Sequence, residues 1–148
     1  MKPVIFFDTS AIIKLYHDED GTDDVLSIIN SYDPLILISD LTKIEFVSAF
    51  AKKVRTNEIT KDICVETIQL FKVDTKKFEI IEIDKNIKLL AIELLEHIAI
   101  KRGLKTLDSL QLASALTFTN NHKLKLFMSS DKVLGQIAEE KGLNALIV

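Results

Sequence analysis

Val4-Ile5-Phe6-Phe7-Asp8-Thr9-Ser10 stands near the start of the 148-residue chain and joins four apolar residues to an acid and two hydroxyl residues. Four consecutive apolar residues indicate a β-strand covered on both faces, because a strand with one face in water alternates apolar and polar residues. Near the other end of the chain, Leu126-Phe127-Met128-Ser129-Ser130-Asp131 repeats this arrangement. We therefore expect two buried strands whose ends carry acids.

Five such apolar runs occur along the chain, and stretches with helical periodicity separate them. The clearest helix is expected over residues 84–100, where apolar side chains recur at spacings of three and four residues. Buried strands that alternate with helices predict an α/β fold, a parallel sheet with helices on both faces. The remaining helices are expected near 10–17, 22–31, 41–55, 60–74, 106–119 and 131–141, and the strands over 3–8, 35–39, 79–83, 124–129 and 144–148.

The composition predicts a single domain that spans residues 1–148. Hydrophobic residues make up 47% of the chain and charged residues 28%, a balance typical of one globular domain of this length. The longest apolar runs are far shorter than the roughly 20 residues of a membrane span. Asp8 also interrupts the first run before it reaches the length of a secretory signal core, so we expect no membrane association and a cytoplasmic location.

Residue types exclude several classes of site. Cys64 is the only cysteine, which excludes an intramolecular disulfide and a cysteine-built zinc site, and its apolar neighbours place it in the core. The three histidines stand apart, and the four glycines form no nucleotide-binding loop. The formal net charge of −3 gives no overall positive field that would indicate a nucleic-acid-binding protein.

Four acids occupy positions from which they can meet at one edge of the sheet, where ligands of open parallel sheets bind. Asp8 and Asp131 follow the first and fourth strands, Glu45 lies about one turn after the second, and Asp108 is the only acid of the helix at 106–119. Carboxylates gathered there would raise one another's pKa unless a cation neutralised them. Ligation by oxygen alone suits Mg²⁺ or Mn²⁺.

Each of these acids also has a purely structural interpretation. Thr42-Lys43-Ile44-Glu45 matches a capping box, in which Glu45 bonds back to the backbone at the helix start. Asp8 is able to cap the first helix, and Asp108 and Asp131 are able to act as first-turn acids that the helix dipole favours. The sequence leaves both interpretations open for every member of the set.

The motifs around the four acids resemble those of PIN-domain ribonucleases. The matching segments are Phe6-Phe7-Asp8-Thr9-Ser10-Ala11, the helical Glu45, Leu107-Asp108-Ser109-Leu110-Gln111-Leu112-Ala113-Ser114-Ala115 and Ser129-Ser130-Asp131-Lys132-Val133-Leu134. Length and motif order are similar to the single-domain toxins of VapBC toxin–antitoxin pairs. The resemblance implies a three-layer α/β/α fold with strand order 3-2-1-4-5 and endonucleolytic cleavage of RNA. It also implies a Mg²⁺ or Mn²⁺ site formed by Asp8, Glu45, Asp108 and Asp131.

Two hydroxyl residues accompany the acids. By the same resemblance, Ser10 matches the small hydroxyl residue of the first motif and Ser129 matches the hydroxyl residue two positions before the last acid. Either hydroxyl could donate a hydrogen bond to a metal ligand or to a phosphate, although both could equally serve at the ends of helices.

The resemblance also implies two protein partners, a cognate antitoxin and a second copy of the chain. Both would contact the helices expected at 41–55 and 60–74. Phe46, Phe50 and Phe71 stand at helical spacing on these helices and are candidates for an exposed apolar surface, although core packing is the ordinary role of such aromatic residues.

Basic residues outside the acidic set could bind an RNA backbone. Without the four acids, 19 basic residues stand against 18 remaining acids, an excess of one positive charge. The clusters Lys52-Lys53-Arg55 and Lys101-Arg102-Lys105 could contact phosphates, although a solvated helix end is the usual meaning of such clusters. Lys14, which follows Asp8 on the first helix, is the first basic residue to test as a substrate-binding or supporting residue.

Other classes of protein remain as alternatives. Asp18-Glu19-Asp20-Gly21-Thr22 contains the Asp-x-Asp-Gly-Thr of haloacid-dehalogenase-like phosphatases, whose first Asp accepts a phosphoryl group. That motif requires a buried strand directly before it, whereas the residues before Asp18 are expected to be helical. A receiver-like signalling module would use Asp84 and would need a lysine after its fifth strand, which this sequence lacks. A PIN fold that only binds a partner would be non-catalytic.

Overall fold

β1 (Val4–Phe7) lies at the centre of a five-stranded parallel sheet with the strand order β3-β2-β1-β4-β5. The other strands are β2 (Leu35–Ser39), β3 (Glu79–Ile81), β4 (Leu126–Ser129) and β5 (Ala145–Ile147). The structure is a computed structural model that describes residues 1–148. The parallel sheet predicted from the apolar runs and the strand order implied by the resemblance are both confirmed.

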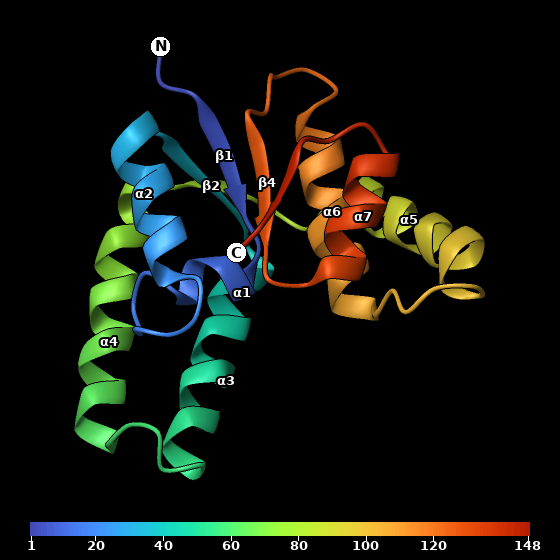
Figure 1. The fold of residues 1–148 in the computed structure, drawn as a ribbon. Helices are drawn as coiled ribbons and strands as arrows, with labels where there is room; N and C mark the ends of the chain where they lie inside the picture. Colours follow the sequence, from blue (N-terminus) through green and yellow to red (C-terminus); the bar gives the residue numbers. More distant parts are fainter.

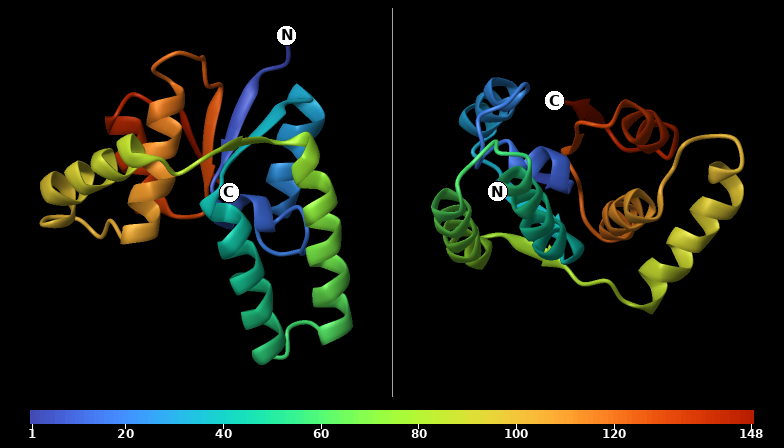
Figure 2. Two further views of the ribbon diagram at one scale, coloured as in Figure 1. Left: turned by 180° about the vertical axis from the view of Figure 1, so that it is seen from behind. Right: turned by 90° about the horizontal axis from the view of Figure 1, so that it is seen from below.

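Helices cover the two faces of the sheet and complete the expected three layers (Figures 1 and 2). Four helices pack on one face, namely α1 (Thr9–Ile13), α2 (Thr22–Tyr32), α3 (Leu41–Arg55) and α4 (Lys61–Asp74). On the other face lie α5 (Lys85–Leu94), α6 (Thr106–Phe118) and α7 (Lys132–Glu140). A 3₁₀ turn, η1 (Thr75–Lys77), and a π-helical turn, η2 (Leu95–Ala99), extend α4 and α5. None of these helices combines the length with the nearly uncharged composition that a bilayer-spanning segment requires.

Two hydrophobic cores lie on opposite faces of the sheet, because successive side chains of a strand point to opposite sides. Phe6 belongs to the core beneath α5, α6 and α7, whereas Ile5 and Phe7 belong to the core beneath α1 to α4. Phe6 stacks on Phe127 of the neighbouring strand, with ring centroids 5.3 Å apart, a pair that contributes about 0.5–1.5 kcal/mol beyond its buried area. Cys64 is buried in the second core, as expected.

Two expected helices end earlier than their periodicity predicts. The helix expected over 10–17 stops at Ile13, because the N–H groups of Lys14, Leu15 and Tyr16 donate to carbonyls three residues back and tighten the chain into a turn. The helix expected over 84–100 is regular only to Leu94 and then widens into η2. Apolar spacing alone does not distinguish a regular helix from these tighter and wider turns.

Of the two roles open to the aromatic residues of α3 and α4, the structure shows core packing and not an exposed surface. Phe46, Phe50 and Phe71 are all buried, and the rings of Phe46 and Phe71 stack with centroids 3.8 Å apart and planes only 7° apart. These rings fill the space between the two helices and join α3 to α4. The apolar side chains that remain exposed on these helices point elsewhere and include Ile44 and Leu70.

Candidate functional site

The carboxyl ends of β1 and β4 and the first turns of α3, α6 and α7 meet at one edge of the sheet (Figure 1, below the strands). Asp8 directly follows β1, and Asp131 lies between β4 and α7. Asp108 is the third residue of α6, and Glu45 is the fifth residue of α3. The structure therefore places the four predicted acids on the elements that converge at this edge.

Asp8 is the most buried of the four acids, with 4% of its surface exposed. Its Oδ1 accepts hydrogen bonds from the Ser10 hydroxyl at 2.6 Å and from the Ala11 N–H at 2.9 Å, so it caps α1 as predicted. Burial raises the pKa of this carboxyl to about 6, because the loss of hydration outweighs the hydrogen bonds from Ser10, Ser129 and Ala11 that favour the charged form. The charge of Asp108 raises the pKa further.

Asp108 connects the acids electrostatically. Burial raises the pKa of the Asp108 carboxyl, and the negative charges of Asp131 and Glu45 raise it further, against the lowering effect of Lys105. Asp108 in turn raises the pKa of Asp8, so its carboxyl is electrostatically linked to the other three acids. Raised pKa values of neighbouring carboxyls are common at functional sites.

Hydroxyl groups tie the ends of β1 and β4 together at this edge. The Ser10 hydroxyl donates to Asp8 and accepts from the Ser130 N–H at 2.9 Å. The Ser129 hydroxyl accepts from the Asp131 N–H at 3.0 Å, and Asp131 in turn accepts from the Leu134 N–H at 3.1 Å and caps α7. Ser10 and Ser129 therefore hold the two strand-end acids in fixed orientations.

Glu45 does not form the predicted capping box. The helix α3 already begins at Leu41, so Thr42 lies inside its first turn, and the side chain of the N-cap residue Asp40 forms no capping hydrogen bond. Glu45 instead accepts hydrogen bonds at Oε1 from the Thr9 hydroxyl at 2.7 Å and from the Gln111 amide at 2.8 Å. The capping interpretation of Glu45 is therefore wrong, and its carboxylate is held across the interface between helices.

Three further polar residues of this site were not predicted from the sequence, and all are buried, namely Thr9, Thr42 and Gln111. A signal for two of them was present, because Thr42 and Gln111 each lie three residues from a candidate acid and therefore on the same helical face. Gln111 stands three residues after Asp108, and Thr42 stands three residues before Glu45.

The oxygen donors at this edge suit a hard divalent cation, although in this structure the side chains lie too far apart to surround one completely. No three Asp, Glu, His or Cys side chains of residues 1–148 lie close enough together to form a complete metal site. The available oxygens are carboxylates and hydroxyls, the ligand types that Mg²⁺ and Mn²⁺ prefer, and Mg²⁺ usually keeps several waters between itself and protein ligands. The residues fit an ion that is bound partly through water.

Lys14 does not extend freely toward the acids. Its side chain is buried, and its ammonium group donates to the Asp20 carbonyl at 2.5 Å and to Glu19 at 3.3 Å. It nevertheless lines a cleft of about 330 Å³ beside the acidic edge, together with Ser10, Lys52 and Lys53. Lys53 is also neutralised by Glu19 and Glu58, whereas Lys52 is exposed and forms no ion pair.

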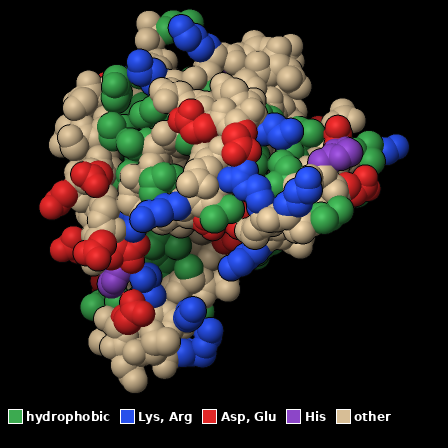
Figure 3. Space-filling view, turned by 45° about the vertical axis from the view of Figure 1, so that its right-hand side comes forward, with side chains coloured by type: hydrophobic (Ala, Val, Ile, Leu, Met, Phe, Trp, Pro, Cys, Tyr) green, Lys and Arg blue, Asp and Glu red, His purple; other side chains and the backbone are tan.

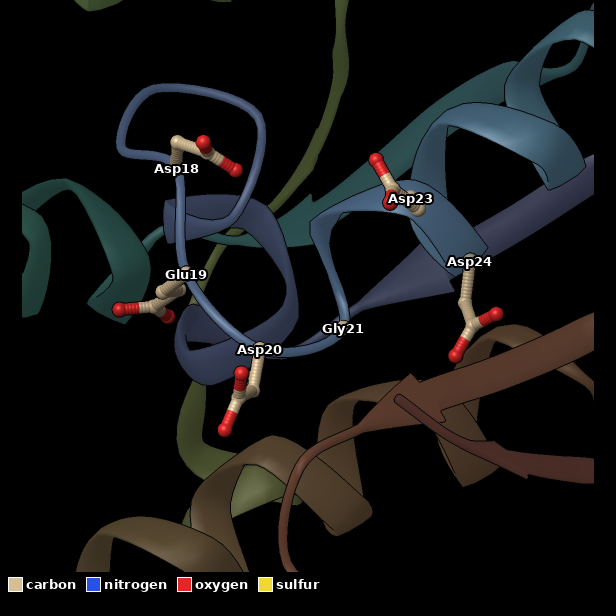
Figure 4. A pocket seen from close by; sticks show the side chains of 6 residues that line it. All are labelled: Asp18, Glu19, Asp20, Gly21, Asp23 and Asp24. Atoms are coloured by element: carbon tan, nitrogen blue, oxygen red, sulfur yellow. The ribbon is translucent and has the colours of Figure 1, made fainter.

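The phosphatase alternative lacks its required context. Asp18 and Asp20 lie in the loop between α1 and α2, and no strand precedes them. Figure 4 shows that the carboxylates of this loop and of the start of α2 point in different directions around a shallow hollow. The Glu19 carboxylate is turned toward Lys14 and Lys53.

The receiver alternative is wrong. Asp84 caps α5 by accepting a hydrogen bond from the Ile87 N–H at 2.9 Å. Receiver-type sheets have the strand order 2-1-3-4-5, which differs from the observed order β3-β2-β1-β4-β5.

Comparison with known proteins identifies the fold. Among solved structures, a toxin–antitoxin complex from Klebsiella pneumoniae matches with a TM-score of 0.64 and 20% identity, covering 90% of this chain and 92% of that chain. VapBC2 from Rickettsia felis, bound to a DNA fragment from its promoter, matches with a TM-score of 0.67 and 14% identity, covering 98% of both chains. VapC20 from Mycobacterium tuberculosis, a toxin that cleaves the sarcin–ricin loop, matches with a TM-score of 0.69 and 14% identity, covering 97% of this chain and 99% of that chain.

At such low sequence identities, the structural similarities show a shared fold and do not assign a family. The family is assigned by comparison of the sequence. No curated protein matches the chain in sequence. The PIN-domain family model matches residues 5–140, a range that includes all four acids. The chain belongs to the PIN-domain family.

Proposed function

We propose that this protein is an endoribonuclease that depends on Mg²⁺ or Mn²⁺. The observation that carries the proposal is the electrostatic coupling of Asp108 to Asp8, Asp131 and Glu45 at one edge of the sheet. The negative charges near Asp8 and Asp108 oppose the charged form of these two carboxyls, and a divalent cation bound among them would relieve that repulsion. Membership of the PIN-domain family and the fold shared with VapC20, a toxin that cleaves RNA, support RNA as the substrate.

The roles of the acids follow from their positions. Asp8 and Asp108 act as direct ligands of the cation, and Asp131 and Glu45 bind it directly or through water. Bound in this way, Mg²⁺ or Mn²⁺ would neutralise the scissile phosphodiester and stabilise the charge that develops as water attacks phosphorus in line and the P–O bond to the leaving oxygen breaks. The Ser10 hydroxyl orients the Asp8 carboxylate, the Ser129 hydroxyl holds the backbone N–H of Asp131, and no side chain is needed as the nucleophile.

We also propose that the chain is the toxin of a toxin–antitoxin pair, with a cognate antitoxin and a second copy of itself as protein partners. Two of the structures that share its fold are toxin–antitoxin complexes. Exposed apolar side chains on α3 and α4, among them Ile44, Ile63 and Leu70, offer an apolar contact surface. Light scattering is expected to show a dimer, and a monomer at micromolar concentration would contradict this part of the proposal.

Asp8→Ala tests the nuclease directly. We expect the purified protein to cleave RNA when Mn²⁺ or Mg²⁺ is present, and we expect a chelator to abolish this cleavage. Asp8→Ala should lower the rate by at least about 100-fold, because it removes a ligand worth several kcal/mol in the transition state. Asp18→Ala is the matched control: it removes an exposed acid of the α1–α2 loop and should leave the rate unchanged. RNA cleavage by Asp8→Ala at the wild-type rate would contradict the proposed nuclease.

A further inference from the structure

Gln111 is a buried amide on the helix that carries Asp108. It lies on α6, only 2% of its surface is exposed, and it stands one turn after Asp108. Its Nε2 lies 2.8 Å from Glu45 Oε1, 3.0 Å from the Thr42 hydroxyl and 3.1 Å from the Thr9 hydroxyl. The amide therefore touches residues from the start of α1 and the start of α3 at the same time.

The hydrogen bonds of this group all favour one oxygen of Glu45. The Gln111 amide and the Thr9 hydroxyl both donate to Oε1, whereas no protein group donates to Oε2. A carboxylate oxygen is the strongest acceptor among the three neighbours of Nε2, so the amide hydrogen nearest to it is committed to Glu45. Two donors on one oxygen fix the plane of the carboxylate and leave Oε2 free for a ligand.

The other end of the Gln111 amide has no partner. Its Oε1 is buried and accepts no hydrogen bond. An unpaired buried acceptor lowers stability, and such groups are uncommon in native proteins. The hydrogen bond to Glu45 fixes the orientation of the Gln111 amide, and in this orientation the amide oxygen of Gln111 has no partner.

We propose that Gln111 is a positioning residue that, together with Thr9, holds the Glu45 carboxylate so that Oε2 faces the cation or its water. This inference rests on the proposed metal-dependent function and assigns Glu45 one committed oxygen and one free oxygen. Residues that orient metal ligands in this way typically change metal affinity or activity by 10-fold to 100-fold when they are replaced.

Gln111→Met tests the inference, because methionine has a similar length and volume but donates no hydrogen bond. We expect Mn²⁺ affinity, measured by calorimetry without RNA, or kcat for RNA cleavage to fall about 10-fold to 100-fold, with KM for RNA little changed. The melting temperature of the metal-free protein should stay equal or rise, because the unpaired oxygen is removed. Gln111→His places a ring N–H the same three bonds from Cβ and should restore part of the lost affinity.

Ser114→Ala is the matched control, since Ser114 is equally buried on α6 but bonds to the Leu110 carbonyl and not to Glu45. Its Mn²⁺ affinity should equal that of the wild type. Gln111→Met that binds Mn²⁺ and cleaves RNA within twofold of the wild type would overturn the inference, as would a loss of Mn²⁺ affinity that Ser114→Ala reproduces. If Gln111→Met does not fold, Thr9→Val removes the second donor to the same oxygen and carries the same expectation. A wild-type protein that neither binds Mn²⁺ nor cleaves RNA would reject the proposed function itself.

Discussion

At the scale of single residues, burial of Asp8 in the folded protein disfavours the charged form of its carboxyl, which the proposed site needs. Its pKa is raised from 3.8 to about 6, so the folded state binds more protons than the unfolded state between these two values. The free energy of unfolding therefore falls as pH rises through this window, and the buried charge costs about 3 kcal/mol above it, since one pKa unit corresponds to about 1.4 kcal/mol.

Asp8→Asn should consequently make the metal-free protein more stable while abolishing RNA cleavage. At pH 7 with a chelator present, we expect the free energy of unfolding in urea to rise by about 1–3 kcal/mol. At pH 4 the gain should disappear, because the wild-type carboxyl is then protonated in the folded state. If Asp8→Asn is less stable than the wild type at pH 7, the hydrogen bonds to the Asp8 carboxylate stabilise the folded protein by more than the burial of its charge costs.

At the scale of elements, the aromatic rings between α3 and α4 are expected to govern stability rather than chemistry. Phe71→Ala should lower the free energy of unfolding by about 3–5 kcal/mol, because Phe71 is buried and stacked on Phe46. Leu70→Ala on the same helix, where the side chain is 54% exposed, should change it by less than about 0.5 kcal/mol. Urea denaturation of both variants measures the difference, and equal effects would contradict the burial of Phe71.

The cleft beside the acids gives a prediction for RNA binding. Lys52 is exposed on α3 and free of ion pairs, so Lys52→Ala should raise KM for RNA and reduce the salt dependence of binding by about one counterion, with kcat unchanged. Lys88→Ala, which removes an exposed lysine from α5 on the other face, is the control. If Lys88→Ala has the same effect, RNA is not guided along this cleft.

The sequence predicts the helices, the strands and the positions of the acids better than it predicts the strand order or the hydrogen bonds between helices. Apolar runs suffice for the strands, because a parallel sheet buries both faces, and acids that follow such runs must lie at the sheet edge. The strand order rests on the family resemblance rather than on periodicity. Thr9 and Gln111 could not be assigned roles, because their partner Glu45 lies on another helix and a polar residue reveals its role only with its neighbour in place. Lys14 stays a proposed contact for RNA, and its pairing with Glu19 is visible only in the structure.

At the scale of the whole molecule, acidic residues slightly outnumber basic ones. On the face seen in Figure 3, lysine and arginine side chains lie among acidic and hydrophobic ones, in keeping with the net charge of −3. A net charge of −3 provides no long-range positive field, so the proposed binding of RNA would depend on local contacts and on a cation held at the acidic edge.

Metal binding should therefore be visible in global stability. If the acids bind Mn²⁺ only in the folded state, a concentration about 100 times the dissociation constant should add about 2.7 kcal/mol to the free energy of unfolding. Calorimetric melting with increasing Mn²⁺ measures this gain, which Asp108→Asn should greatly reduce. A wild-type melting temperature that does not respond to Mn²⁺ would argue against a site formed by these acids.

The two cores on either side of the sheet have one more consequence. Glu45 is carried by the layer of α1 to α4, Asp108 and Asp131 by the layer of α5 to α7, and Asp8 by the strand between them. The acidic edge is thus built from three layers, and the distances between its carboxylate oxygens depend on how the side chains of each layer pack. Substitutions deep in either core should therefore shift Glu45 relative to Asp108 and Asp131. A partner bound to α3 and α4 would act on the same distances.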